Sequence, residues 1–333
     1  MEGYDGMQHS GTAHARAFSN IAFIKYWGNQ DHRLRLPVSS SVSMNLSGLY
    51  SDTVVEWGTH LEQDTLVLNG EVATSEALKR IVTYLDLVRE LYKFDGYFAV
   101  FSSNTFPTGA GIASSASGFA ALAFAINQSV GLQLSERELS TLARLGSGSA
   151  SRSIPGGFVQ WHQGNDHASS YAETIAPMDH WDLVDVIAII SKGHKAVGST
   201  EGHGLAATSV LQEGRLKDVD VRFHRCKQSL LSRDFDAFAE VVEYDSNLMH
   251  AVMMTSSPPL FYWQPGSVHV MQQVRQWRTE GLEVCFTLDA GPNVHCICLS
   301  AAAPQVQSRL RELEGVMDVL VATPAGAAYS VEL

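Results

Sequence analysis

Strand-like and helix-like segments are mixed along the whole chain, and this mixture limits its fold more than any other feature. Runs typical of strands lie at 17–25, 53–56, 66–68 and 97–102, and a helical face of apolar residues occupies 75–91. No internal repeat or low-complexity tract interrupts the pattern. The sequence therefore predicts an α+β or α/β fold.

The elements of the later sequence follow the same irregular order. The segment 114–130 is rich in alanine and apolar on nearly all sides, which predicts a buried helix. Ser135 and Glu138 have the spacing of a capping box and open a helix that stops at Gly146. A polar stretch near residue 180 marks the predicted boundary between domains 1–180 and 181–333. The remaining predicted elements are helices around 204–213, 218–231, 235–254 and after Pro304, and strands at 183–190, 283–288, 294–299 and 316–322.

Composition excludes several classes of protein. The chain has 333 residues, 45% of them hydrophobic, and can bury a large core, so wholesale disorder is excluded. The formal net charge of −12 argues against a general nucleic-acid binder and against a protein of anionic membranes. A phosphorylated ligand must therefore find a locally positive pocket on a negative protein.

The cysteines and the apolar runs are typical of a cytoplasmic protein. Cys226, Cys285, Cys296 and Cys298 form no CxxC pair, and four cysteines in a chain of this length are no disulfide framework. We therefore expect reduced thiols in the core, with Cys296 and Cys298 on one face of a strand. No run approaches eighteen consecutive apolar residues, and the first residues contain no apolar signal core, so no membrane span is expected.

A Gly/Ser-rich segment at 106–117 is the strongest local signal of a site. Gly109 and Gly111 allow the backbone to approach a ligand closely, and Ser114 begins the predicted helix. Unpaired N–H groups and the positive end of the helix dipole favour an anion there, so the segment predicts a phosphate site. It is not a Walker loop, because no Gly-Lys-Ser/Thr follows, and no suitably spaced acidic residue supports a dinucleotide fingerprint. The alternative is an ordinary Gly-rich loop with a serine N-cap.

Three further segments carry residues suited to catalysis or binding. Arg152 follows a dense Gly/Ser turn and is suited to bind a carboxylate, or is a surface charge after a helix end. Asp289 follows an apolar strand in a Gly-Pro turn, where it is either catalytic or forms an Asx turn. Lys25 ends the first apolar strand, where a lone lysine is usually solvated, but Trp27 and the serines at 39–41 are typical of a site.

Taken in order, these segments resemble the mevalonate diphosphate decarboxylases of the GHMP kinase superfamily. The resemblance runs from about residue 15 to residue 300, and its Lys-Tyr-Trp-Gly and Asp-Ala-Gly-Pro-Asn pieces are specific to the decarboxylases. The matching segments are Asn20-Ile-Ala, Lys25-Tyr-Trp-Gly28, Leu36-Pro, Ser39-Ser-Ser41, Phe106-Pro-Thr, Gly111-Ile-Ala-Ser-Ser-Ala, Gly146-Ser-Gly-Ser-Ala-Ser-Arg152, Asp245-Ser-Asn, His250-Ala, Pro258-Pro, Phe261-Tyr262 and Asp289-Ala-Gly-Pro-Asn293.

The resemblance implies the fold and the reaction. The fold is an α+β GHMP kinase fold, with a left-handed βαβ crossover in the N-terminal domain, a ferredoxin-like C-terminal domain and the site between them. The reaction uses ATP to phosphorylate the tertiary hydroxyl of a mevalonate derivative, and phosphate then leaves with CO2 to give an alkene. Mg2+ would bridge phosphate oxygens largely through water, with Ser115 as a candidate ligand. A homodimer is expected from the family, with a small phosphorylated mevalonate as substrate and no nucleic acid or membrane as partner.

By the same resemblance, Asp289 acts as base or orienting acceptor beside the hydroxyl, and Lys25 is its counter-cation. Arg152 clamps the substrate carboxylate with help from Asn20. The residues expected to contact the rest of the substrate are Tyr26, Asn29, Ser147, Ser149 and Ser199. Those expected to hold the ATP phosphates are Gly109, Gly111, Ser114, Ser115 and Ser117. The segment Asp245-Ser-Asn is expected to be a polar brace on a helix, and His250 has no clear chemical role.

Two departures from the family pattern predict the substrate. Most diphosphomevalonate enzymes follow Trp-Gly with a lysine, where this chain has Asn29, and many bacterial members carry an arginine where this chain has Glu201. A charge-assisted contact contributes about 1.5–3 kcal/mol, so the two changes disfavour a diphosphate. We therefore predict 5-phosphomevalonate as substrate and isopentenyl phosphate as product. The cations close enough in sequence to compensate are Lys192, His194, Lys195 and His203.

Three alternatives stay open from the sequence. One is a diphosphomevalonate decarboxylase that makes isopentenyl diphosphate. Another is a GHMP kinase that phosphorylates a mevalonate derivative without decarboxylation. The third is a binding protein without catalysis, against which the presence of Lys25, Arg152 and Asp289 argues.

Overall fold

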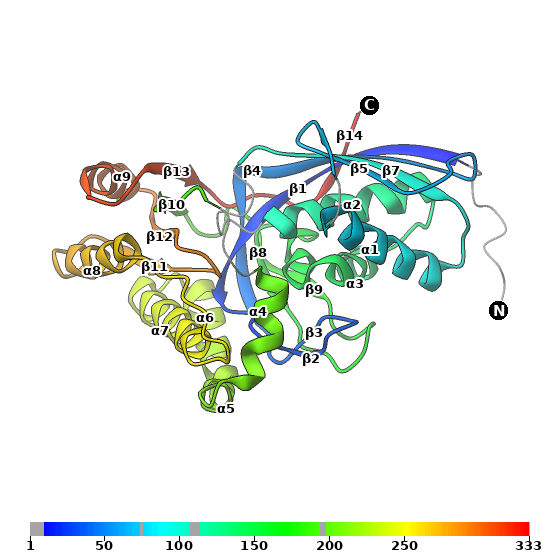
Figure 1. Ribbon diagram of the computed structural model, residues 1–333. Helices are drawn as coiled ribbons and strands as arrows, with labels where there is room; N and C mark the ends of the chain where they lie inside the picture. The colour runs from blue at the N-terminus through cyan, green and yellow to red at the C-terminus, as the bar shows by residue number, and fades with distance from the viewer. Residues whose placement is uncertain (1–9, 74–75, 107–113, 194–197, 333) are drawn as a thin grey trace.

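A large mixed sheet forms one half of the molecule. The computed structural model describes residues 10–73, 76–106, 114–193 and 198–332. The sheet runs in the order β14-β1-β4-β7-β5-β6, and β8 pairs with β4 and β9 (Figure 1). Its strands are β1 (Ser10–Ile24), β4 (Ser41–Gly58), β5 (Thr65–Leu68), β6 (Glu71–Val72), β7 (Tyr97–Asn104), β8 (Phe158–Trp161), β9 (Ala172–Ala176) and β14 (Tyr329–Val331).

Two long antiparallel strands, β1 and β4, run through this sheet toward the second half of the molecule. They pair from Ser10 opposite Gly58 to Ile24 opposite Val42, with irregular register at two points. The predicted strand at 17–25 corresponds to the second half of β1, and the one at 53–56 lies in the last third of β4. Lys25 directly follows the last residue of β1, Ile24.

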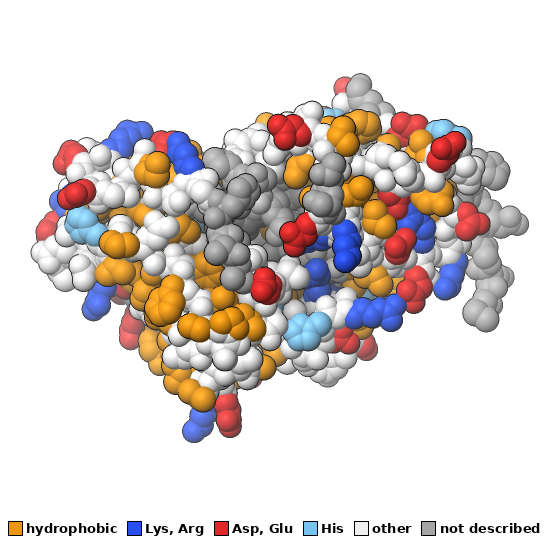
Figure 2. Space-filling view, in the orientation of Figure 1, with side chains coloured by type: hydrophobic (Ala, Val, Ile, Leu, Met, Phe, Trp, Pro, Cys, Tyr) orange, Lys and Arg blue, Asp and Glu red, His pale blue; other side chains and the backbone are white. Residues whose placement is uncertain are grey.

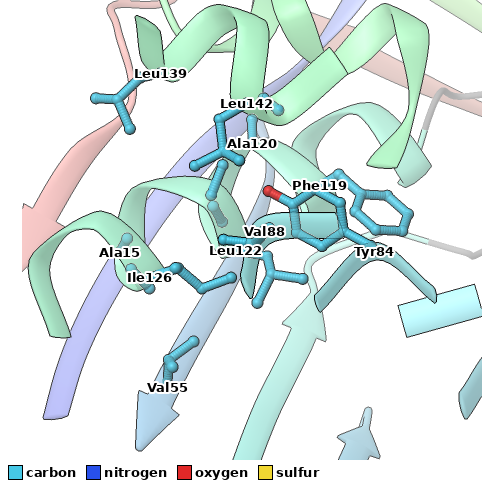
Figure 3. Packing of buried hydrophobic residues seen from close by; sticks show 14 of the residues in the cluster. Ala15, Val55, Tyr84, Val88, Phe119, Ala120, Leu122, Ile126, Leu139 and Leu142 are labelled. Atoms are coloured by element: carbon cyan, nitrogen blue, oxygen red, sulfur yellow. The ribbon is translucent and has the colours of Figure 1, made fainter. Parts of the chain in front are cut away.

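Three helices, α1 (Glu76–Tyr92), α2 (Ser114–Val130) and α3 (Glu136–Gly146), pack against the large sheet. The predicted buried helix is confirmed, because α2 lies on β1 and β4 and against α3. The predicted capping box is also present, with Ser135 and Glu138 bonded reciprocally at the start of α3. Figure 3 shows the core between these helices and the sheet, where Tyr84 and Phe119 meet edge to face.

The second sheet has the order β11-β12-β10-β13 and antiparallel pairing. With helices inserted after β10 and after β12, this is the βαββαβ ferredoxin-like arrangement that the sequence predicts. Its strands are β10 (Leu183–Ile189), β11 (Val284–Thr287), β12 (Val294–Leu299) and β13 (Asp318–Ala322). Its helices are α4 (Ser199–Leu205), η2 (Ala206–Thr208), α5 (Gln212–Lys217), α6 (Val219–Ser232), α7 (Phe235–Met254), α8 (Pro265–Thr279) and α9 (Ala303–Glu312).

Two smaller elements and the last strand complete the fold. A hairpin of β2 (Asn29–Asp31) and β3 (Leu36–Pro37) follows β1, and the 3-10 helix η1 (Gly148–Ser153) follows α3. Strand β14 returns to pair with β1, although it follows all four strands of the second sheet. The domain boundary predicted near residue 180 stays a prediction.

The four cysteines are free and buried, as the sequence predicts. Cys285, Cys296 and Cys298 belong to the second sheet, and Cys226 lies in α6. Within the described ranges, no helix combines the length and the apolar character that crossing a bilayer requires.

Candidate active site

A lysine and an aspartate from opposite halves of the molecule meet at the centre of the candidate site. Lys25 directly follows β1, and Asp289 lies just after β11 in the second sheet. The Nζ of Lys25 is 2.7 Å from Oδ1 of Asp289. The lysine side chain is 1% exposed, whereas the aspartate side chain is 24% exposed and open to a cleft.

Burial and neighbouring charge set the protonation of this pair. Burial lowers the pKa of Lys25 below its ordinary value, although the charge of Asp289 opposes the shift. Burial alone would raise the pKa of Asp289, but the charge and hydrogen bond of Lys25, together with the charge of Arg152, outweigh it and hold the pKa below its ordinary value. Asp289 is therefore a carboxylate near neutral pH, able to accept a hydrogen bond or a proton.

Arg152 lies beside the pair, and hydrogen bonds to Asn20 and Ser41 fix its guanidinium. Its Nε and Nη2 donate to Oδ1 of Asn20 at 3.2 and 3.1 Å, and its Nη1 donates to Oγ of Ser41 at 2.8 Å. Asn20 in turn donates to the carbonyl of Ser149 and to Oγ of Ser153. Burial lowers the pKa of Arg152 to about 10, so the guanidinium stays charged at neutral pH. In the part of the chain that the structure describes, Arg152 forms no ion pair within 4 Å, which leaves its charge available to a bound anion.

Helix α7 braces both strand ends that carry the pair. Asp245 accepts a hydrogen bond from the backbone N–H of Lys25 at 2.7 Å and another from Nε of Arg222 at 2.8 Å. Ser246 accepts one from the backbone N–H of Leu288, the residue before Asp289, at 3.0 Å. The predicted role of Asp245-Ser-Asn as a polar brace is confirmed, since one helical turn fixes both chain segments.

Two buried histidines flank Asp289, and sequence reasoning gave neither of them a role. His250 lies against the backbone of Leu288 and Asp289, and burial with the nearby charge of Lys25 lowers its pKa to about 3. Nδ1 of His295 lies 2.6 Å from Oδ2 of Asp185, and both side chains are buried. The sequence does hold a signal for this second pair, because a His and an Asp interrupt otherwise apolar central strands.

A cleft of about 1010 Å³ contains most of the predicted site residues. Figure 2 shows Lys and Arg side chains on the side of this cleft nearest α1, with Asp and Glu side chains among them. The predicted residues that line it are Lys25, Tyr26, Ser114, Ser115, Ser147, Ser149, Arg152, Ser199 and Asp289. Those that do not are Asn20, Asn29 and Ser117.

The three predicted residues outside the lining have partners of their own. Asn20 holds Arg152, and Oδ1 of Asn29 accepts a hydrogen bond from the hydroxyl of Tyr26 at 2.5 Å. Ser117 is buried and lies 2.7 Å from the hydroxyl of Ser51. Their predicted direct contacts with ligands therefore stay predictions. Gly109 and Gly111 lie outside the described residues.

Of the cations offered as compensation for Asn29 and Glu201, Lys192 is engaged elsewhere and His203 is neutral. The backbone N–H of Gly28 donates to Nδ1 of His203 at 3.0 Å, and a ring nitrogen that accepts a hydrogen bond belongs to a neutral imidazole. The ring of His203 stacks on Tyr26 at 4.0 Å. Lys192 pairs with Asp318 at 3.1 Å on the surface. Residues 194 and 195 lie outside the described part of the chain.

Comparison with known proteins places this geometry in a family. Residues 17–172 match the family model of the diphosphomevalonate decarboxylase-like N-terminal domain, and residues 185–322 match that of the mevalonate 5-diphosphate decarboxylase C-terminal domain. The diphosphomevalonate decarboxylase of Candida albicans is 39% identical over 291 residues, which cover 82% of this chain and 80% of that protein. The chain belongs to the diphosphomevalonate decarboxylase family.

Solved structures of the family agree with the fold described above. A complex described as MDDEF with MVAPP, AMPPCP and magnesium is similar with a TM-score of 0.92 and 37% identity, over 97% of this chain and 100% of that chain. The mevalonate diphosphate decarboxylase of Staphylococcus aureus is similar with a TM-score of 0.91 and 37% identity, over 97% and 98%. The predicted GHMP kinase fold and the predicted ATP-dependent carboxy-lyase family are thereby confirmed.

One relative within the decarboxylase family differs in its named substrate. The phosphomevalonate decarboxylase of Haloferax volcanii is 34% identical over 285 residues, which cover 85% of this chain and 87% of that protein. The family therefore includes relatives named for a monophosphate and relatives named for a diphosphate, at comparable similarity to this chain.

Proposed function

We propose that this protein decarboxylates 5-phosphomevalonate with ATP, giving isopentenyl phosphate, ADP, phosphate and CO2. The observation that carries the proposal is the convergence of Lys25, Asp289 and Arg152 in one cleft, with the first two in contact at 2.7 Å. Each residue matches one requirement of the reaction. Asp289 accepts the hydroxyl proton, Lys25 is the cation beside the transferred phosphoryl group, and Arg152 binds the carboxylate with two N–H groups.

The chemistry follows from these positions. Asp289 accepts the proton of the tertiary hydroxyl while that oxygen forms a bond to the terminal phosphorus of ATP and the bond to ADP breaks. The new phosphate ester is a good leaving group, unlike hydroxide. When its C–O bond breaks, the electron pair of the neighbouring bond to the carboxylate forms the alkene, and CO2 departs. Arg152 holds the carboxylate in line for this step, and Lys25 offsets the changing negative charge.

Mg2+ would be held mainly by the nucleotide rather than by a set of protein ligands. Across the described ranges, no group of three or more His, Cys, Asp or Glu side chains is arranged to hold a metal ion. Oxygen ligands suit Mg2+, and the hydroxyl of Ser115 lines the cleft at the start of α2. The ion would therefore be held by phosphate oxygens with Ser115 as a candidate protein ligand, and it would supply charge neutralisation.

The monophosphate is favoured by the charges near Tyr26. Asn29 is neutral, His203 is neutral, and Glu201 places a negative charge on the cleft wall. Compared with the family pattern, a second phosphate would lack the charge-assisted contacts at positions 29 and 201, which are each worth about 1.5–3 kcal/mol. The diphosphate is the second candidate, because the similar proteins of Candida albicans and Staphylococcus aureus are named for it.

The decisive experiment measures ADP and CO2 together with mevalonate, its 5-phosphate and its 5-diphosphate. We expect the highest kcat/KM with the 5-phosphate and equal amounts of ADP and CO2. Equal or better turnover of the diphosphate would overturn the assigned substrate. Formation of ADP without CO2 would make the protein a kinase.

A further inference from the structure

Arg35 is a cleft-lining arginine for which the reaction above has no use. It lies between β2 and β3, and its backbone has φ of +50°, in the left-handed region. Glycine and asparagine are the usual residues at such turn positions, because a larger side chain is strained there. The guanidinium lines the cleft, and its Nε donates to the carbonyl of Leu145 at 2.9 Å. A long cationic side chain therefore occupies a turn position that favours a small residue.

A second guanidinium lies close to the first. Arg80 of α1 lines the same cleft, and its Nη2 donates to the carbonyl of Gly146 at 3.2 Å. Its Nε is buried without a hydrogen-bond partner among the described residues. Burial, and then the like charge of Arg35, lower the pKa of Arg80 to about 10, while Glu76 opposes the shift from a distance. Two cations that repel each other on one wall would both be stabilised by an anion.

Neither arginine has an acidic partner in the part of the chain that the structure describes. No carboxylate lies within 4 Å of Arg35 or Arg80 there, and the undescribed internal segments 74–75, 107–113 and 194–197 contain no Asp or Glu. Arg33, in the same hairpin and on the same cleft, instead pairs with Glu90 at 2.8 Å. Capping the carbonyls at the end of α3 uses only one N–H group of each guanidinium, although an arginine has five.

We propose that Arg35 binds the phosphate group of the substrate and is a specificity-determining residue of this enzyme. The inference rests on the proposed function, which supplies a substrate with its reacting hydroxyl and its phosphate at opposite ends of a short chain. The reacting end is fixed at Lys25 and Asp289, and the start of α2 with Ser114 offers a site for the nucleotide. Arg35 lines the same cleft, close enough to Tyr26, the residue after Lys25, for its charge to act on the tyrosine hydroxyl.

The test compares Arg35→Met, which removes the charge, with Arg35→Lys, which keeps a charge without the fork. Arg33→Met is the matched control, because it removes a cleft-lining arginine that already has a carboxylate partner. Arg35→Met is expected to raise KM for 5-phosphomevalonate about tenfold or more, with kcat and KM for ATP changed less than about threefold. Arg35→Lys should recover part of the loss, and Arg33→Met should leave every parameter near that of the wild type.

Two results would overturn the inference. A larger rise in KM for ATP than for 5-phosphomevalonate would assign Arg35 to the nucleotide. A lowered melting temperature of Arg35→Met with unchanged KM would show that Arg35 only caps a carbonyl group at the end of α3.

Failure of the proposed function is distinguished by direct binding. Tryptophan fluorescence of the wild type and Arg35→Met is titrated with mevalonate, its 5-phosphate and its 5-diphosphate without nucleotide. If the wild type prefers the diphosphate or makes no CO2, the proposed function fails. In that case the role of Arg35 is still decided by the variant. Arg35→Met should bind the phosphorylated compound more weakly than the wild type does, while its affinity for mevalonate stays the same. If the wild type binds neither phosphorylated compound, both proposals are wrong.

Discussion

Lys25 is a buried charge, and it depends on the half-buried carboxylate of Asp289. Removing an ion from water costs several kcal/mol, and a partner at hydrogen-bond distance offsets much of that cost. Their contact therefore keeps the carboxylate ionised while it faces the cleft. The same contact joins the end of β1 to the end of β11, so the reacting group is placed by both sheets at once.

Asp289→Asn tests the proton acceptor without changing the size of the side chain. We expect kcat to fall by about 10²- to 10⁴-fold, because a positioned base is lost, while the affinity for ATP stays near that of the wild type. Coupled measurement of ADP and CO2 gives the rate. Asp179→Asn, an exposed position near the predicted domain boundary, is the control. Residual turnover above a tenth of the wild-type rate would remove Asp289 from the mechanism.

Gly148→Ala tests how closely the chain approaches Tyr26. A Cβ at this position would lie 2.6 Å from three atoms of the tyrosine side chain, so the ring must shift. We expect a loss of stability of about 1–3 kcal/mol and a higher KM for the phosphorylated substrate. Gly204→Ala is the control, because a Cβ there meets nothing within 4 Å. Unchanged KM in Gly148→Ala would show that the position of Tyr26 does not matter for substrate binding.

At the scale of elements, α7 determines whether the two sheets present their residues correctly. Ser246→Ala removes the hydrogen bond to the backbone N–H of Leu288 and leaves that buried donor unpaired, at a cost of about 1–3 kcal/mol. Because the strand end carries Asp289, we expect kcat to fall while KM for ATP stays constant. Ser232→Ala, at an exposed position in α6, should change neither. Equal kcat in the two variants would contradict the bracing role.

Elements with strong local signals could be predicted from the sequence, and others could not. The capping box of α3 appears as expected, because its signal acts within a few residues. The full length of β4 was missed, since its serine- and asparagine-rich first part looks like a loop. That part is buried, and the long pairing with β1 decides its structure.

Helix α8 was missed for a different reason. It begins at Pro265 after a segment with two other prolines, and its mean composition is polar. Its inward face is a sparse stripe of Val270, Met271, Val274 and Trp277. Packing against β11 stabilises such a helix more than its own propensity does.

The residues of the candidate site also divide into those that could be predicted from the sequence and those that could not. Lys25, Arg152 and Asp289 could be predicted because each lies in a short segment that resembles the family, and all three line the cleft. Arg35 could not be predicted, and the strands mark His295 and Asp185 only as unusual residues without pairing them, because the significance of each depends on partners distant in sequence. Only tertiary contacts show that Arg35 has no acidic partner among the described residues and that His295 has one in Asp185.

At the scale of the whole molecule, the buried His250 links stability to pH. The unfolded chain takes up a proton at this ring near its ordinary pKa of 6.5, whereas the native protein does so only near 3. Because the unfolded state binds more protons between these values, the free energy of unfolding falls as the pH drops through this range. This stability is present above about pH 6.5 and is lost progressively toward pH 3.

Urea unfolding at pH 7 and pH 5 checks this linkage. His250→Gln should lose up to about 2 kcal/mol less than the wild type between the two pH values. His224→Gln, at an exposed position in α6, should lose as much as the wild type. Identical losses in all three proteins would contradict the burial of a neutral ring at position 250.

The placement of the four cysteines gives the protein an internal reporter. All of them follow residue 225, all are buried, and burial raises the pKa of each thiol, to about 12 for Cys298. A sulfhydryl reagent such as a chromogenic disulfide should hardly react with the native molecule, since reaction requires an accessible thiolate. Its rate of colour development in mild denaturant should therefore time the opening of the ferredoxin-like half alone, without a label or a tag. Rapid reaction in plain buffer would show that this half opens spontaneously.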